Sequence, residues 1–230
     1  MSKGFLKYIT CGSVDDGKST LIGHMLYDAK LLFVDQKRAL ELESRVDSRN
    51  GKVDYSLLLD GLSAEREQGI TIDVAYRYFG TRKRNFIVAD TPGHREYTRN
   101  MAVGASFADL AIVLVDASKG LLLQTKRHCR ICALMGIKHF VFAINKMDII
   151  HFDQKVFGEI QEAIQTLMLD FSFDSLQIIP VSATGGDNIV QKSPNMIWYD
   201  GLTLLEYLEN VNVGYKINEK KFVMSVQRVC

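Results

Sequence analysis

A glycine-rich stretch near the N-terminus constrains this chain more than any other feature. It fits the pattern Gly-x4-Gly-Lys-[Ser/Thr] and reads Gly12-Ser13-Val14-Asp15-Asp16-Gly17-Lys18-Ser19-Thr20. An apolar run typical of a buried strand, Phe5–Cys11, precedes it, and apolar residues at helical spacing follow it. Between a strand and a helix, the glycines let backbone N–H groups curl around an anion, and the helix N-terminus adds the positive end of its dipole. The sequence therefore predicts a phosphate-binding loop.

The residues of this loop have predicted parts in holding a nucleotide. Lys18 is expected to reach the β- and γ-phosphates, and the Ser19 hydroxyl is expected to ligate Mg²⁺. We expect the whole loop to contact the nucleotide, namely Gly12, Ser13, Val14, Asp15, Asp16, Gly17, Lys18, Ser19 and Thr20. The alternative is a glycine-rich turn that binds nothing, which the strand–loop–helix context disfavours.

Length and composition narrow the class of protein. A chain of 230 residues with 47% hydrophobic residues can build one sizeable core. The net charge of +1 gives no basic field for nucleic acid and no acidic excess for disorder, so no nucleic-acid partner is expected. A signal peptide is not apparent, and no stretch of about 18 apolar residues predicts a membrane span. Four scattered cysteines fit a reducing cytoplasm, which is the expected location.

Two of the cysteines form a Cys129-x2-Cys132 pair, which is compatible with half of a zinc or redox site. The pair lies inside an expected helix, Gln124–Met135, and the chain has no second cysteine pair. His128 alone does not complete four ligands. Packing inside a helix is therefore the favoured interpretation.

Strand-like and helix-like segments alternate along the chain. Continuous apolar runs suit a sheet that is covered on both faces, and they lie at Phe5–Cys11, Ile72–Phe79, Phe86–Ala89, Leu110–Val115, Phe140–Ile144 and Leu176–Val181. Asp153 is expected to cap a helix, and Thr203 with Glu206 forms an expected capping box. The fold class is α/β, with a doubly wound, mostly parallel sheet and helices on both faces.

Two regions stand apart from this pattern. Lys30–Tyr55 is a charged insertion in which we expect a short exposed helix, Asp35–Val46, and a turn at residues 48–51. The domain division is expected to be a nucleotide-binding domain over residues 1–212 and, over 213–230, a linker with the first strand of a following domain. That strand-like run is Lys221–Val229, and we expect the natural chain to continue beyond it.

The next candidate site residues occur in an ordered set along the chain. The set supports a functional role for each residue more strongly than any one of them does alone. Asp90 and Gly93, in Asp90-Thr91-Pro92-Gly93, end a strand where ligands of open α/β sheets bind. We expect Asp90 to hold Mg²⁺, usually through water, and the Gly93 N–H to sense the γ-phosphate. Thr71 ends a polar loop of the kind that closes over Mg²⁺ and γ-phosphate and opens after hydrolysis. The predicted metal residues are therefore Ser19, Thr71 and Asp90.

A base site is predicted by Asn145-Lys146-Met147-Asp148, which follows an apolar strand. Asp148 can accept hydrogen bonds from N1–H and N2–H₂ of guanine, whereas adenine offers neither donor on that edge. A site of this type discriminates by on the order of 10⁴-fold. Lys146 can lie across the base, and Ser182-Ala183 is expected to contact the guanine oxygen through backbone N–H. The chain is therefore predicted to bind GTP and GDP, not ATP.

The order of these motifs resembles the translation-factor class of P-loop GTPases. Within that class, residues 5–212 are similar to the large GTP-binding subunit of bacterial sulfate adenylyltransferase (ATP sulfurylase), above all in the stretch Leu59–Phe79. The resemblance implies that GTP hydrolysis is coupled to adenylylsulfate synthesis from ATP and sulfate by a separate small catalytic subunit. It also implies that residues 1–212 are a GTP-binding domain and that the domain begun by residues 213–230 is a β-barrel. Two departures from the family pattern are His24, where Arg is usual, and Arg95-Glu96 in place of Glu-Gln.

The implied reaction is direct attack of water on the γ-phosphate. His94 is expected to orient that water, while Lys18, Thr71 and the loop N–H groups stabilise charge. Asp15, three positions before Lys18, is expected to hold a monovalent cation such as K⁺ against the phosphates. The alternative for Asp15 is a cap on nearby backbone N–H groups, and the alternative for His94 is an ordinary surface histidine.

Two other function classes stay open from the sequence. One is a translation elongation factor that binds aminoacyl-tRNA and the ribosome, and the other is a guanine-nucleotide switch without catalytic turnover. A further variant of the main interpretation is a fused adenylylsulfate kinase domain beyond Cys230. Binding of RNA, copurification of a small adenylyltransferase subunit and multiple turnover of GTP distinguish these classes.

Overall fold

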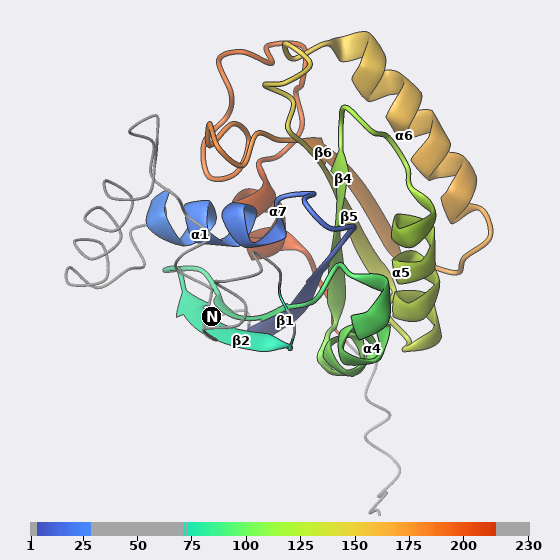
Figure 1. Ribbon diagram of the computed structural model, residues 1–230. Coiled ribbons are helices and arrows are strands. Elements are labelled where there is room, and N and C mark those ends of the chain that lie inside the picture. Colours follow the sequence, from blue (N-terminus) through green and yellow to red (C-terminus); the bar gives the residue numbers. More distant parts are fainter. Residues whose placement is uncertain (1–3, 29–70, 72, 215–230) are drawn as a thin grey trace, which may run out of the picture.

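The computed structural model describes residues 4–28, 71 and 73–214 (Figure 1). In this part of the chain six strands form one sheet in the order β2-β3-β1-β4-β5-β6. The strands are β1 (Phe5–Cys11), β2 (Ala75–Gly80), β3 (Asn85–Asp90), β4 (Leu110–Asp116), β5 (His139–Asn145) and β6 (Ser175–Pro180). The helices are α1 (Lys18–Asp28), the short 3-10 helix η2 (Arg95–Tyr97), α4 (Thr98–Phe107), α5 (Leu123–Leu134), α6 (Gln154–Met168) and α7 (Leu204–Asn210).

The sheet is mostly parallel, which confirms the predicted α/β class. β1 pairs in parallel with β3 and β4, and the parallel pairing continues through β5 to β6. The exception is the edge strand β2, which runs antiparallel to β3. This strand starts at Ala75, later than the predicted Ile72; the chain bends at Asp73, whose carboxylate accepts a hydrogen bond from the Val74 N–H at 2.7 Å.

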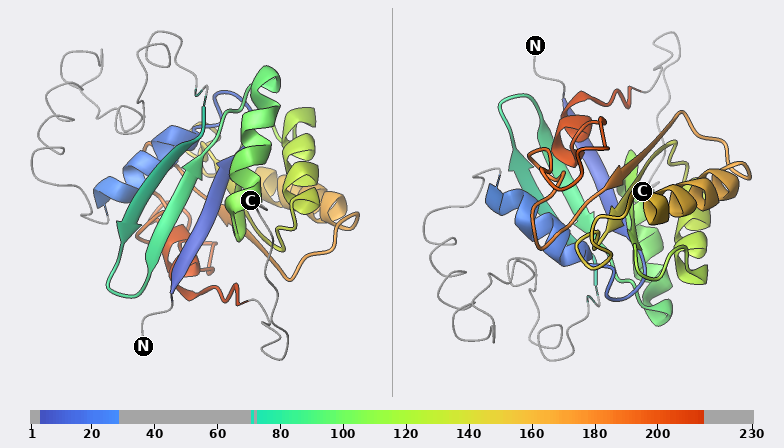
Figure 2. Two further views of the ribbon diagram at one scale, coloured as in Figure 1. Left: turned by 90° about the horizontal axis from the view of Figure 1, so that it is seen from below. Right: turned by 90° about the horizontal axis from the view of Figure 1, so that it is seen from above.

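Helices cover both faces of the sheet and create two apolar layers (Figures 1 and 2). One layer packs α1 and α7 against strand residues such as Tyr8, Val88 and Ile112. The other layer packs α4, α5 and α6 against the opposite face, with Phe142 among its fully buried side chains. Because the central strands β4 and β5 are buried on both faces, their sequences are continuously apolar instead of alternating.

Two helix starts agree with their sequence signals. The Asp153 carboxylate accepts hydrogen bonds from the Lys155 and Val156 N–H groups at the start of α6. The Thr203 hydroxyl and the Glu206 carboxylate form the reciprocal capping box of α7. Both caps are therefore confirmed.

The cysteines of α5 serve in packing. Cys129 and Cys132 are fully buried in the apolar layer beneath the helix, and Cys11 at the end of β1 lies in the same layer. Burial raises the pKa of the Cys129 thiol well above its ordinary value, which keeps it protonated. These three thiols behave as small apolar side chains of the core.

Several expectations concern residues beyond the described part. The helix Asp35–Val46, the turn at 48–51 and the strand Lys221–Val229 lie outside the described residues, and the domain division at 212 stays a prediction. Among the helices that the structure describes, none combines the length and apolar character needed to cross a membrane.

Candidate functional site

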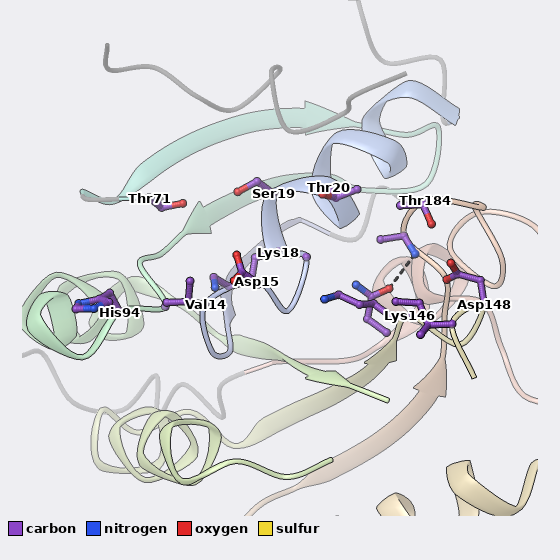
Figure 3. Close-up of a pocket in the computed structure, with 15 residues that line it drawn as sticks. Val14, Asp15, Lys18, Ser19, Thr20, Thr71, His94, Lys146, Asp148 and Thr184 are labelled. Atoms are coloured by element: carbon purple, nitrogen blue, oxygen red, sulfur yellow. Dashed lines mark hydrogen bonds between the residues drawn. The ribbon is translucent and has the colours of Figure 1, made fainter. Parts of the chain in front are cut away.

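The carboxyl ends of four strands surround a cavity of about 410 Å³. It lies at the carboxyl edge of the sheet, where the loops after β1, β3, β5 and β6 converge. Figure 3 shows His94 and Val14 at one end of the cavity and Asp148 and Thr184 at the other, with Lys18 between them. The lining residues are Val14, Asp15, Gly17, Lys18, Ser19, Thr20, Thr71, Gly93, His94, Asn145, Lys146, Asp148, Ile149, Ala183 and Thr184. Residues predicted from five separate motifs thus line one cavity.

Lys18 is held at the centre of the predicted phosphate loop. Its Nζ donates to the carbonyl oxygens of Ser13 at 2.8 Å and Gly12 at 3.3 Å. Burial lowers the pKa of Lys18, against the opposing effects of Asp90 and Asp16. An anion in the cavity would compensate for the lost hydration of this ammonium group, so the site favours a phosphate ligand.

Gly93 comes so close to this loop that no side chain fits. A Cβ at Gly93 would lie 2.5 Å from Lys18 Nζ and 2.8 Å from the Gly12 carbonyl oxygen. The backbone of the segment after β3 therefore lies directly beside the lysine ammonium group. This contact is the one expected of a residue whose N–H senses the terminal phosphate.

Asp90 and Ser19 form the predicted metal corner. Asp90 Oδ2 accepts from Ser19 Oγ at 3.1 Å, and Asp90 Oδ1 accepts from Thr10 Oγ1 at 2.9 Å. Burial raises the pKa of Asp90, against the opposing charge of Lys18. A hydroxyl oxygen and a carboxylate oxygen are hard donors of the kind that Mg²⁺ takes in proteins, directly or through water. The donor set, which Thr71 on the cavity wall extends, therefore fits Mg²⁺.

Some predicted contact residues lie behind the cavity wall. The Ser13 N–H donates to Asp16 Oδ2 at 2.6 Å, and the Gly12 N–H donates to His128 Nδ1 at 3.2 Å. These two N–H groups are used within the protein, so the phosphate-facing N–H groups must come from later in the loop. The Asp16 side chain is buried with its carboxylate turned inward, and burial raises its pKa. Asp16 thus shapes the loop through its side chain.

His128 on α5 supports the phosphate loop from below. Its side chain is fully buried, and its Nδ1 accepts the Gly12 N–H. Burial, helped by the nearby charge of Lys18, lowers the pKa of His128 to about 4. Sequence reasoning considered this histidine only as an incomplete metal site, because no local pattern links it to a loop 116 positions away.

Acidification should therefore destabilise the fold through His128. An unfolded histidine has a pKa near 6.5, so the unfolded chain binds the extra proton between about pH 6.5 and 4, and stability falls as the pH drops through that window. We expect the wild type to lose about 2 kcal/mol more than His128→Asn between pH 7 and pH 5. The asparagine keeps an acceptor for the Gly12 N–H but does not titrate. Urea denaturation at both pH values measures the difference, and equal losses would contradict the assignment.

The predicted base motif is held by three hydrogen bonds. Asn145 Nδ2 donates to the Asp16 carbonyl oxygen at 2.8 Å, and Asn145 Oδ1 accepts the Ala183 N–H at 2.8 Å. The Asp148 Oδ1 atom accepts from Ser182 Oγ at 2.7 Å, which orients the carboxylate on the cavity wall. The Ala183 N–H, which was expected to contact the guanine oxygen, is thus engaged by Asn145. Ser182 is fully buried and acts through Asp148.

Lys146 is fixed by a partner that the sequence did not single out. Its Nζ lies 2.8 Å from Oδ2 of Asp116, a buried carboxylate at the end of β4. Burial raises the pKa of Asp116, but hydrogen bonds from Lys146 and Ser118 outweigh this effect and hold the pKa below its ordinary value. The ion pair stretches the lysine stem along the cavity, where it can cover one face of a flat base.

His94 lies at the end of the cavity opposite Asp148 (Figure 3). Its Nδ1 accepts the Glu96 N–H at 3.4 Å, just before the 3-10 helix η2, and its side chain is 44% exposed. The ring of Tyr97 lies 6.0 Å away, centre to centre. His94 therefore lines the cavity with a partly exposed side chain. This position suits a group that is needed only during the reaction.

The strand–loop–helix with its lysine, the aspartate after β3 and the Asn-Lys-x-Asp loop define a P-loop GTPase domain. The family described as Elongation factor Tu GTP binding domain matches residues 3–212. The chain therefore belongs to this family, and it is a GTP-binding domain of the translation-factor class.

Two relatives of high sequence identity show which proteins of this class the chain resembles. Sulfate adenylyltransferase subunit 1 of Vibrio parahaemolyticus is 55% identical over 229 residues, which are 99% of this chain and 48% of that protein. The bifunctional enzyme NodQ of Rhizobium meliloti is 56% identical over 229 residues, 99% of this chain and 36% of NodQ. The chain thus spans about half, or less, of the length of these relatives.

Solved structures support the fold. The Saccharomyces cerevisiae Ski7 GTPase-like domain bound to GTP has a TM-score of 0.75 at 23% identity, covering 90% of this chain and 49% of that one. Sup35 complexed with GMPPNP has a TM-score of 0.62 at 25% identity, covering 92% and 46%.

Proposed function

We propose that this domain hydrolyses GTP as part of a sulfate adenylyltransferase large subunit, and that hydrolysis drives adenylylsulfate synthesis by a separate small catalytic subunit. The observation that carries the proposal is one cavity lined by the predicted phosphate-loop and base-site residues, in a chain 52–55% identical to several proteins named sulfate adenylyltransferase subunit 1. The proposed setting is the cytoplasm, and the proposed partner is that small subunit.

The nucleotide is proposed to lie along the length of the cavity. Its phosphates face the loop from Val14 to Thr20, close to the buried ammonium group of Lys18. Its base enters the end between Lys146 and Asp148, where a carboxylate selects guanine by its N1–H and N2–H₂ donors. In Figure 3, Asp148 at the base end and His94 lie at opposite ends of the cavity.

Ser19, Thr71 and Asp90 are proposed to hold Mg²⁺. An ion held there would neutralise charge on the phosphates. Lys18 is proposed to stabilise the charge that develops on the transferred phosphoryl group, together with N–H groups of the loop. The Gly93 backbone, beside the Lys18 ammonium group, is proposed to detect whether a third phosphate is present.

His94 is proposed to orient the attacking water. Because its Nδ1 accepts the Glu96 N–H, the neutral ring carries its proton on Nε2, which can donate to the water. The step forms no covalent intermediate. Asp15, exposed in the loop at a left-handed backbone angle of +64°, is proposed to hold K⁺ against the phosphates.

The proposal is tested with GTP, ATP and sulfate. We expect the purified chain in Mg²⁺ and K⁺ to hydrolyse GTP slowly, with lower turnover when Na⁺ replaces K⁺, and to release no pyrophosphate from ATP and sulfate. Slow turnover is expected because switch loops commonly await a partner. In the complete large subunit, adding the small subunit should yield GTP-dependent pyrophosphate release. Pyrophosphate production by this chain alone, or stable binding of aminoacyl-tRNA instead of the small subunit, would refute the assignment.

A further inference from the structure

His24 lies on α1 beneath the loop that follows β6, and it is nearly inaccessible, at 5% exposure. Its Nδ1 atom lies 2.6 Å from the carbonyl oxygen of Ala183, and its Nε2 atom lies 3.1 Å from a carboxylate oxygen of Asp28. A carbonyl oxygen only accepts hydrogen bonds, so Nδ1 carries the proton and donates to Ala183. The imidazole therefore links α1 to the loop that follows β6, 159 positions further along the chain. We call this loop, which contains Ala183 and Thr184, the base loop.

The base loop rests directly on this ring. Gly186 has a backbone φ of +81°, and a Cβ at that position would lie 2.8 Å from His24 Nε2. On its other side the same loop is tied to β5, because the Ala183 N–H donates to Asn145 Oδ1. Ala183 is thus held through both of its backbone polar groups, by α1 from below and by β5 from the side.

Holding this carbonyl fixes the direction of the next N–H. The Ala183 carbonyl and the Thr184 N–H belong to one amide, and in a trans peptide these two groups point in opposite directions. The described part of the chain contains no cis peptide. Because the carbonyl points down to buried His24, the Thr184 N–H points away from it, and Thr184 lines the cavity. Among the described residues this N–H has no acceptor.

We propose that His24 is a positioning residue for guanine specificity. By holding the Ala183 carbonyl, it aims the Thr184 N–H at the cavity, where this group donates to the O6 atom of guanine. Adenine carries a donor amino group at that position, so the aimed N–H rejects adenine as well as selecting guanine. The inference rests on the proposed placement of the base between Lys146 and Asp148.

A double-mutant cycle between the protein and the nucleotide tests the proposal. The protein change is His24→Leu, and the ligand change replaces GDP by 6-thioguanosine diphosphate, in which a weakly accepting sulfur replaces O6 while the N1–H and N2–H₂ donors to Asp148 are kept. We expect His24→Leu to weaken GDP by about tenfold and the analogue by less than twofold, since only GDP has the O6 acceptor to lose. Equal weakening of both ligands, or of neither, would show a merely structural role and overturn the inference.

Two isosteric variants keep the test decisive if His24→Leu folds poorly. In His24→Asn the amide nitrogen can take the place of Nδ1 and keep the bond to Ala183, whereas in His24→Gln it reaches the Nε2 side toward Asp28. We expect Asn to retain the wild-type ratio of GDP to analogue affinity and Gln to lose it. The reverse order would overturn the inference. Failure of the wild type to prefer GDP over ADP would instead refute the proposed base site, so the two failures are distinguishable.

Discussion

Asp148→Asn should lower GDP affinity by on the order of 10³-fold and shift preference toward xanthosine diphosphate. Asp148 lies on the cavity wall with Oδ1 held by Ser182 Oγ at 2.7 Å, so its direction is set before the base arrives. Asparagine offers one acceptor and one donor where the carboxylate offers two acceptors. The amide NH₂ group would face the donor amino group of guanine, but it matches the oxygen that xanthine carries there.

Calorimetric titration of the wild type and the variant with GDP, xanthosine diphosphate and ADP measures this change. Asp170→Asn, an exposed carboxylate after α6 and away from the cavity, is the matched control and should leave all three affinities unchanged. If the Asp148→Asn protein still prefers GDP over xanthosine diphosphate, Asp148 does not select the base.

The parts of the site whose residues lie close together in the sequence could be predicted. The loop from Gly12 to Thr20, the aspartate after β3 and the Asn145–Asp148 loop each depend on residues a few positions apart, beside an apolar strand. Strands covered on both faces are also easy to predict, since β4 is buried at every position. The edge strand β2 alternates between half-buried and exposed residues, and its start was predicted too early.

The supporting contacts were beyond sequence reasoning for a physical reason. His128 reaches Gly12 across 116 positions, His24 reaches Ala183 across 159, and Lys146 reaches Asp116 across 30. Each contact depends on how a helix or strand is placed in the fold, which no local spacing encodes. His24 was visible only as a departure from a family pattern. Its partner appears only when α1 and the loop after β6 are packed together.

The same reason explains why two loop residues behave differently from expectation. The whole loop from Gly12 to Thr20 was predicted to contact the nucleotide. In the structure His128 and the Asp16 carboxylate take up the N–H groups of Gly12 and Ser13. The start of the loop is therefore anchored to the protein, and the part from Val14 onward faces the cavity. An anchored start reduces the entropy lost when the rest of the loop closes around phosphate.

Lys18→Ala and His94→Ala should separate binding from chemistry. Lys18 is buried at the centre of the loop, beside the carbonyl oxygens of Gly12 and Ser13. Its charge faces the phosphates both before and during reaction, so its loss should weaken GDP and GTP at least about 100-fold. His94 stands at the rim with a 44% exposed side chain. Its loss should leave GDP affinity within about twofold and slow single-turnover GTP hydrolysis by about 10²-fold or more.

Matched variants make this separation interpretable. Lys126→Ala removes an exposed lysine of α5 and should change neither affinity nor turnover. His94→Gln keeps a side-chain donor at the rim and should recover part of the lost rate, because orienting water requires a hydrogen-bond donor more than a titrating ring. Mant-GDP binding and single-turnover phosphate release measure the two quantities on the same samples. If His94→Ala hydrolysed GTP at the wild-type rate, another group would have to orient the water. Thr71 would then be the first to test, since it also lines the cavity.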